Sequence, residues 1–328
     1  MDNIIGHSST LQLLQHMASR DRLPHALLFS GPPAVGKQLI ARAFVVQCML
    51  SIKKRLKPAI DIEANCEKLV RNGTHPDFCN IIVEDGKKDI SVGQVRALTK
   101  ELYLQPYYPG CKFALINDAH RMSIAGSNAL LMLLEEPPPN TYIILVSEAA
   151  HRLPRTIVSR CQVVHFSYLR QEDLRQVIRK LLNAQSEEES MVERLTRICD
   201  GTLAPLCVGD FVDSRSLSIL DSNGLKKHLA SIDVECASLH RQLLQIAARH
   251  ESAVSIATTL AQDADKQVIL WPAIRTFARY ELQKACVERR DVALWADFGM
   301  QVLCAEQLVR ERNANLELQL SNLLLRQL

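Results

Sequence analysis

The residues best suited to chemistry form a phosphate-binding pattern near the start of the chain. Gly31, Gly36 and Lys37 fall between an apolar run at residues 26–29 and a helix-like run at residues 39–44. Glycines in such a loop let backbone N–H groups curl around a phosphate, and the N-terminus of the following helix adds a positive dipole. The lysine at the end of the loop reaches the outer phosphates. The pattern therefore predicts a phosphate-binding loop that joins a buried strand to a helix.

Two positions that should carry the hydrolytic chemistry lack the required groups. Gln38 stands where the pattern calls for a Ser or Thr hydroxyl that binds magnesium, and an amide of that length would displace the metal. Asp118 lies near the end of the apolar stretch 112–119, where it could hold the water shell of a magnesium ion. The next residue, Ala119, can accept no proton from an attacking water. The sequence therefore favours a nucleotide-binding type of fold far more than it favours hydrolysis.

Strands and helices are expected to alternate in the first half of the chain. Strands that alternate with helices favour a parallel, doubly wound sheet, so the expected fold class is α/β. From Tyr168 onward only helical patterns occur, which predicts an all-α remainder forming a bundle or an assembly surface. The apolar stretches that predict strands are 26–29, 78–83, 112–119, 142–147 and 162–166.

A metal site would be sought in the segment after the first loop and its helix. Cys48 is expected to open an irregular segment that runs to Cys66, with His75 and Cys79 beyond it. These residue types can bind zinc, but the intervals between them contain no Cys-x-x-Cys pair, and two such pairs fix tetrahedral geometry most readily. Core or surface thiols are therefore the favoured interpretation, and zinc is the lesser alternative.

The overall composition restricts the class of protein. The 328 residues are 47% hydrophobic and 23% charged, which is typical of a soluble globular protein with two or three domains. No apolar run is long enough to cross a bilayer and no export signal opens the chain, so we expect a cytoplasmic protein without a membrane partner. A net charge of +3 is too small to indicate a dedicated DNA-binding protein. The ten cysteines show no paired framework, as expected in a reducing compartment.

Five motifs in a fixed order resemble the clamp-loader branch of the AAA+ ATPases, and within it the delta-prime subunits of bacterial DNA polymerase III. The Leu-Glu-Glu-Pro-Pro and Ser-Arg-Cys motifs are highly specific when they occur together. The motifs occupy residues 31–37, 74–77, 117–119, 134–138 and 159–161.

The resemblance implies a layout for the whole chain. It implies an AAA+ core with a parallel sheet at residues 1–167, which includes a degenerate zinc-module insertion at about 48–79. A small three-helix lid is expected at residues 168–208, and an all-α collar that mediates oligomerisation at residues 209–328.

The resemblance also implies roles for single residues. Arg160 matches the arginine that in such loaders projects into a neighbouring subunit's ATP site and stabilises charge on the transferring γ-phosphoryl group, with a structural salt bridge as the alternative. Ser147 falls at the sensor position, although an ordinary hydroxyl at a strand end is the favoured interpretation. Lys37 could pair with a phosphate or only with its own loop. The expected degenerate nucleotide site comprises Gly31, Gly36, Lys37, Gln38, Asp118 and Ser147.

Three departures from the family's pattern indicate a subunit that does not hydrolyse ATP. Gln38 and Ala119 lack the metal-binding hydroxyl and the base, and the lid segment 201–205 has no arginine where active relatives carry a second sensor. Loss of a general base alone costs about 10²–10⁴ in rate. We therefore expect no cofactor on this chain, since ATP binding is not favoured and the family's four-cysteine zinc knuckle is eroded.

The leading hypothesis is a non-hydrolysing, delta-prime-type subunit of the DNA polymerase III clamp loader, within a DNA-directed DNA polymerase holoenzyme. It would help to load the sliding clamp on primed DNA and lend Arg160 to a neighbouring ATPase subunit. The expected partners are gamma/tau and delta subunits in a heteropentamer and, through that assembly, the clamp and DNA. An active gamma/tau-like motor subunit is the alternative, and a free-standing nucleotide-binding module is the third hypothesis.

Overall fold

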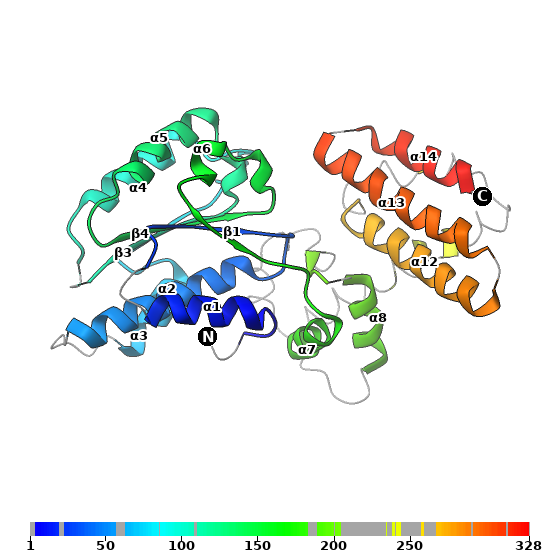
Figure 1. Cartoon of the computed structure of the whole chain (residues 1–328), viewed down its shortest axis with the longest axis horizontal. Coiled ribbons are helices and arrows are strands. Elements are labelled where there is room, and N and C mark those ends of the chain that lie inside the picture. The colour runs from blue at the N-terminus through cyan, green and yellow to red at the C-terminus, as the bar shows by residue number, and fades with distance from the viewer. Residues whose placement is uncertain are drawn as a thin grey trace. The chain divides into compact units, whose positions relative to one another are not determined.

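The computed structural model of the chain divides into two compact units, Met1–Leu169 and Arg170–Leu328 (Figure 1). The border expected between lid and collar, at residues 208 and 209, lies outside the described residues, so that division stays a prediction. The structure describes residues 4–19, 23–56, 63–84, 86–107, 110–182, 189–199, 201–204, 234, 238–239, 241–243, 257–258, 267–289, 291–312 and 314–327.

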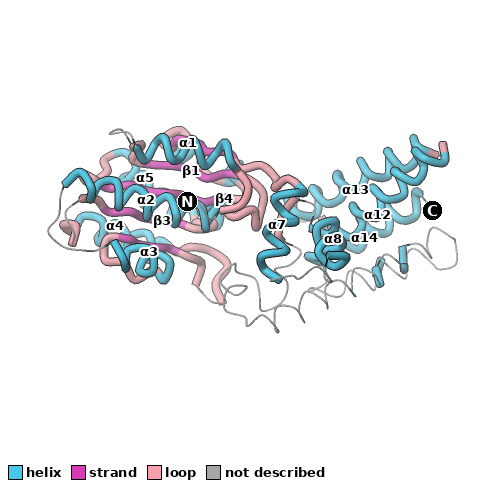
Figure 2. Tube along the Cα trace, turned by 90° about the horizontal axis from the view of Figure 1, so that it is seen from below, coloured by secondary structure: helices cyan, strands magenta, loops and turns pink. Residues whose placement is uncertain are grey.

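The first unit is built on a five-stranded sheet whose strands are all parallel and run in the order β2-β3-β4-β1-β5. Figure 2 shows the strands, in magenta, side by side across the first unit. Strands that are buried on both faces read as continuous apolar runs, and β4 is buried at six of its seven residues. The expected parallel α/β fold is therefore confirmed. The strands are β1 (Ala26–Ser30), β2 (Phe78–Ile81), β3 (Lys112–Ile116), β4 (Thr141–Ser147) and β5 (Gln162–His165).

Helices cover both faces of this sheet and close a separate apolar core on each (Figure 1). One face carries α1 (Ser8–Ser19), α2 (Lys37–Leu56) and α3 (Glu63–Asn72). The other carries α4 (Val92–Tyr103), α5 (Ile124–Glu135) and the short α6 (Arg155–Val158). Two 3₁₀ turns, η1 (Ala119–Arg121) and η2 (Ala150–Arg152), follow β3 and β4 and lead the chain towards α5 and α6.

The segment expected to be irregular between Cys48 and Cys66 is helical, so that expectation was wrong. Helix α2 continues through Cys48 to Leu56, and Cys66 lies in α3. The physical reason is that residues 48–56 contain no glycine or proline, and that Leu, Met, Lys and Arg support a helix. The first residue able to break the helix is Pro58, which lies outside the described residues.

In the second unit, all of the described elements are helices, as the sequence predicts. Phe277 and Phe298 each meet Trp295 edge to face, with ring centroids 5.8 and 5.7 Å apart, and the largely buried Arg275 pairs with Glu306. Among the described residues no helix is both long and apolar enough to cross a membrane. The expected helix at 239–248 is only partly described. The helices are α7 (Gln171–Leu182), α8 (Glu189–Cys199), α12 (Gln267–Glu288), α13 (Val292–Arg312) and α14 (Leu316–Gln327).

Candidate functional site

The predicted phosphate-binding loop connects β1 to α2, as the sequence indicates. The loop begins where the backbone N–H of Gly31 donates to the carbonyl of Ser147 at 3.3 Å. A Cβ atom on Gly31 would lie 2.3 Å from the carbonyl oxygen of Phe166, so no larger residue fits there. Gly36 has φ +94°, in the left-handed region that favours glycine. The two glycines are therefore required by the backbone of this chain itself.

Lys37 is bound to the loop it belongs to. Its ammonium group donates to the carbonyl of Gly31 at 2.9 Å and to the carbonyl of Pro32. The side chain is 4% exposed. Burial lowers the pKa of Lys37, and the negative charges of Glu148 and Asp118 oppose that shift. Lys37 therefore makes the contacts with its own loop that the sequence gives as one of two alternatives, and its pairing with a phosphate stays a prediction.

Two of the remaining predicted residues, Asp118 and Ser147, lie at the carboxyl ends of β3 and β4. Asp118 follows β3 in a left-handed conformation, with φ +48°, and the fully buried Ala119 opens η1. Ser147 is also fully buried, and its hydroxyl accepts the N–H of Ala149 at 3.2 Å. Such a local bond is typical of a polar residue that ends a strand. Gln38 is half-buried in the first turn of α2.

His120 is a residue of this edge that the sequence analysis did not single out. Burial lowers its pKa, the nearby charge of Asp118 raises it, and Arg152, Arg121 and Lys37 lower it further. Within the described residues its buried Nδ1 has no hydrogen-bond partner. His120 lies next to Ala119, the position that lacks the expected base, and the lowered pKa of His120 favours its neutral form.

Arg160 is held at the end of α6 by two contacts. Its guanidinium donates to the carbonyl of Thr156 at 2.9 Å and forms an ion pair with Glu135, at 2.6 Å between Nη2 and Oε1. Glu135 is the last residue of α5, so the pair joins the Leu-Glu-Glu-Pro-Pro motif to the Ser-Arg-Cys motif. The two side chains are 36% and 49% exposed, which limits such a pair to about 0–1 kcal/mol of stability.

The register of the sheet separates Arg160 from the phosphate-binding loop. Gln162, the first residue of β5, pairs with Leu27 of β1, and the loop begins four residues further on, at Gly31. Arg160 precedes β5 and therefore lies at the amino edge of the sheet, whereas Lys37, Asp118 and Ser147 lie at the carboxyl edge. At 3.3 Å per residue the two sites are about 15–20 Å apart. An arginine side chain cannot span that distance, so Arg160 cannot act on the loop of its own chain.

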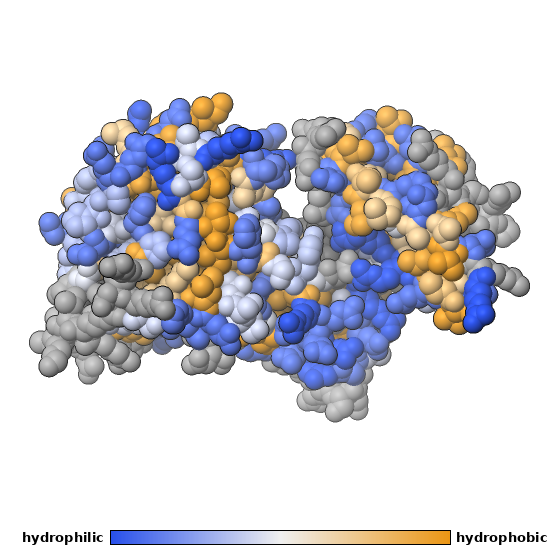
Figure 3. Space-filling view, in the orientation of Figure 1, coloured by the Kyte–Doolittle hydropathy of each residue, from blue (hydrophilic) through white to orange (hydrophobic). Residues whose placement is uncertain are grey.

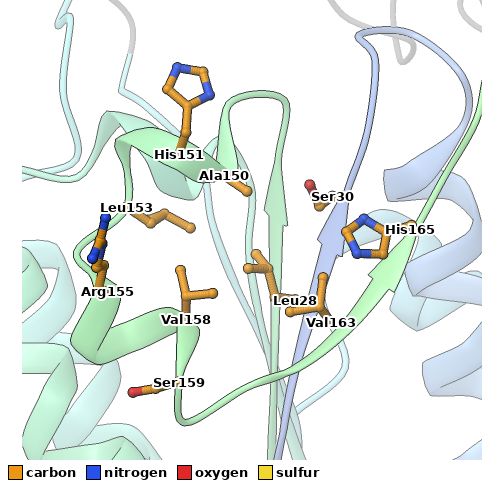
Figure 4. Close-up of a pocket in the computed structure, with 10 residues that line it drawn as sticks. All are labelled: Leu28, Ser30, Ala150, His151, Leu153, Arg155, Val158, Ser159, Val163 and His165. Atoms are coloured by element: carbon orange, nitrogen blue, oxygen red, sulfur yellow. The ribbon is translucent and has the colours of Figure 1, made fainter.

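A cleft of about 600 Å³ opens between β1, β5 and the segment that contains η2 and α6 (Figure 4). Leu28, Val158 and Val163 give it an apolar floor, while Ser30 and His165 lie at its strand-end rim. Figure 3 shows apolar side chains gathered on this side of the first unit. None of the residues predicted to bind a nucleotide lines the cleft. The lining comprises Leu28, Ser30, Ala150, His151, Leu153, Arg155, Val158, Ser159, Val163 and His165.

The four candidate zinc ligands are distributed over α2, α3, a loop and β2. Cys48 and Cys66 are buried, and His75 accepts the N–H of Asp77 on its Nδ1 at 3.1 Å. Burial raises the pKa of the Cys48 thiol well above its usual range, and that of Cys79 to about 11. Within the part of the chain that the structure describes, no three His, Cys, Asp or Glu side chains are grouped so that they could hold a metal ion.

Thiol reactivity provides a direct test of this burial. Burial raises the pKa of Cys161 to about 12, so only ~10⁻⁴ of that thiol is ionised at pH 8, against roughly a quarter for an ordinary cysteine. Cys286 and Cys304 are exposed. We expect iodoacetamide at pH 8 to modify these two at least ~100 times faster than Cys79 and Cys161, as followed by peptide mass spectrometry. In urea all four should react alike, and equal rates in the native protein would contradict the burial.

A family model described as DNA polymerase III, delta subunit, matches residues 6–170, which is half of the chain. The protein belongs to this family. The matched segment contains the whole parallel sheet, the phosphate-binding loop and Arg160, so the first unit is the part of the chain that carries the family's features.

Curated relatives agree with the family assignment. The chain is 33% identical over 159 residues to DNA polymerase III subunit delta' of Bacillus subtilis, covering 48% of this chain and 47% of the relative. It is 34% identical over 149 residues to subunit delta' of Pseudomonas aeruginosa, covering 45% of each. It is 29% identical over 202 residues to subunit tau of B. subtilis, covering 61% of this chain and 35% of the relative. The matches therefore span about a third to a half of these relatives' own length.

Proposed function

We propose that this protein is a non-hydrolysing, delta-prime-type subunit of the DNA polymerase III clamp loader, and that it supplies Arg160 to the ATP site of a neighbouring subunit. It works in the cytoplasm, in a heteropentamer with gamma/tau and delta subunits that places the sliding clamp on primed DNA. The relatives named delta' and tau support a place in that assembly.

The position of Arg160 is the observation that carries this proposal. Arg160 lies at the amino edge of the sheet, about 15–20 Å from its own phosphate-binding loop, and its guanidinium is partly exposed. A planar and permanently charged guanidinium is suited to phosphate oxygens. An arginine so placed can serve a nucleotide only on another chain, which is what an arginine finger acting in trans requires.

The site on this chain supports the loss of its own hydrolysis. Lys37 is bound to the carbonyls of Gly31 and Pro32, so a phosphate would have to displace both contacts. Ala119 offers no base, and Gln38 offers no hydroxyl for magnesium. Each defect removes a separate part of the chemistry, and a missing base alone costs about 10²–10⁴ in rate.

A gamma/tau-like motor subunit is the second candidate, because tau of B. subtilis aligns over more of this chain than the delta' relatives do. ATP binding and turnover by the isolated chain decide between the two. We expect the isolated protein to show no turnover above background, whereas the loader reconstituted with it turns over ATP much faster than the loader without it. Turnover by the isolated chain would establish the motor subunit and refute our proposal.

A further inference from the structure

The ion pair between Glu135 and Arg160 carries an inference about how the finger is prepared for its partner. Glu135 ends α5, and Glu136 and then three prolines follow it, so the chain just beyond Glu135 is restricted. The carboxylate lies 2.6 Å from Nη2 of Arg160, while the carbonyl of Thr156 accepts from Nη1 at 2.9 Å. Two acceptors on two different helices thus contact the two terminal nitrogens of one guanidinium.

We propose that Glu135 is a positioning residue for the finger. An exposed arginine samples many rotamers, and ordering such a side chain at an interface weakens binding. Because the Glu135 carboxylate and the Thr156 carbonyl both accept from the guanidinium, its position is fixed before the neighbouring protomer binds. A guanidinium has five N–H donors, and two of them serve these contacts, so the others can still reach phosphate oxygens. Glu135 itself touches no substrate.

The partial exposure of the Glu135–Arg160 ion pair fits a role in positioning the guanidinium better than a role in stabilising the fold. A pair with half-exposed partners adds little to folding, yet its geometry is fixed at both ends, by a helix terminus and by a backbone carbonyl. Glu136 is the natural comparison, because it is the adjacent exposed glutamate. Its backbone N–H donates to the carbonyl of Met132, and its backbone carbonyl accepts from the hydroxyl of Tyr103. The inference rests on the proposed function of Arg160.

The test compares Glu135→Ala with Glu136→Ala in the reconstituted loader. We expect Glu135→Ala to lower kcat for ATP about two- to tenfold with KM for ATP unchanged, which is the effect of ordering one long side chain. Glu135→Gln should fall between Glu135→Ala and the wild type, and Glu136→Ala should match the wild type. Unchanged turnover in Glu135→Ala, or a higher turnover, would overturn the positioning role.

A double-mutant cycle separates this inference from the function it rests on. In an Arg160→Ala background Glu135→Ala should have no further effect, because the residue acts only through the guanidinium. A further loss there would show that Glu135 has another role and would refute the inference. If Arg160→Ala itself leaves turnover unchanged, the proposed finger fails. If Arg160→Ala lowers turnover but Glu135→Ala does not, only the positioning role fails.

Discussion

Replacement of Arg160 by alanine should lower ATP turnover at the adjoining site of the reconstituted loader by about 10³ or more, because a finger supplied in trans contributes about 10³–10⁵ in rate. The measurement is steady-state hydrolysis by a loader in which the phosphate-loop lysines of the other competent sites have been replaced, so that only the site beside this chain turns over. Assembly should persist, since Arg160 contributes only one partly exposed ion pair and one exposed hydrogen bond to its own chain.

Arg155→Ala is the matched control for that experiment. Arg155 opens α6, five residues before Arg160, and is exposed. The two substitutions remove the same charge from the same short segment, so a general electrostatic effect on assembly would appear in both. We expect turnover to fall only for Arg160→Ala. An equal fall in both variants, or no fall in either, would show that Arg160 does not act on the partner's nucleotide.

The strands of the core could be predicted from the sequence because a parallel sheet is buried on both faces. Continuous apolar runs such as the one that forms β4 are specific for that environment. The ends of strands were less predictable. The expected strands ending at Val83 and Ala119 stop at Ile81 and Ile116, and the left-handed backbone of Asp118 turns the chain out of the sheet. The hydrophobic pattern of a sequence does not predict local backbone geometry of that kind.

The contacts of the site residues could not be predicted, because they join segments that are far apart in the sequence. Motif spacing identified Lys37 and Arg160, but nothing in the spacing shows that Lys37 bonds to two carbonyls of its own loop. The same holds for the ion pair of Arg160 with Glu135, 25 positions earlier in the chain. The register of β5 on β1, which places Arg160 at the other edge of the sheet, is likewise a property of the fold alone.

Gly31→Ala should lower the free energy of unfolding by about 3 kcal/mol, because the added methyl group would overlap with neighbouring atoms. Its carbon would lie 2.3 Å from the carbonyl oxygen of Phe166 and 2.8 Å from the Cβ of that residue. Phe166 cannot move aside easily, since its N–H donates to Ser30 at 2.7 Å and its ring packs 5.1 Å from Phe29. The measurement is the urea midpoint of unfolding, followed by circular dichroism.

Gly93→Ala provides the control, because the same methyl group is added where space exists. Gly93 lies in the first turn of α4, and its new Cβ would meet only the hydroxyl of Ser91, at an ordinary 3.7 Å. Alanine supports a helix better than glycine by up to about 1 kcal/mol, so stability should be unchanged or slightly raised. A Gly31→Ala protein as stable as Gly93→Ala would mean that the segment after β5 can move away from the loop. The glycine at the start of the loop would then not be needed for the fold.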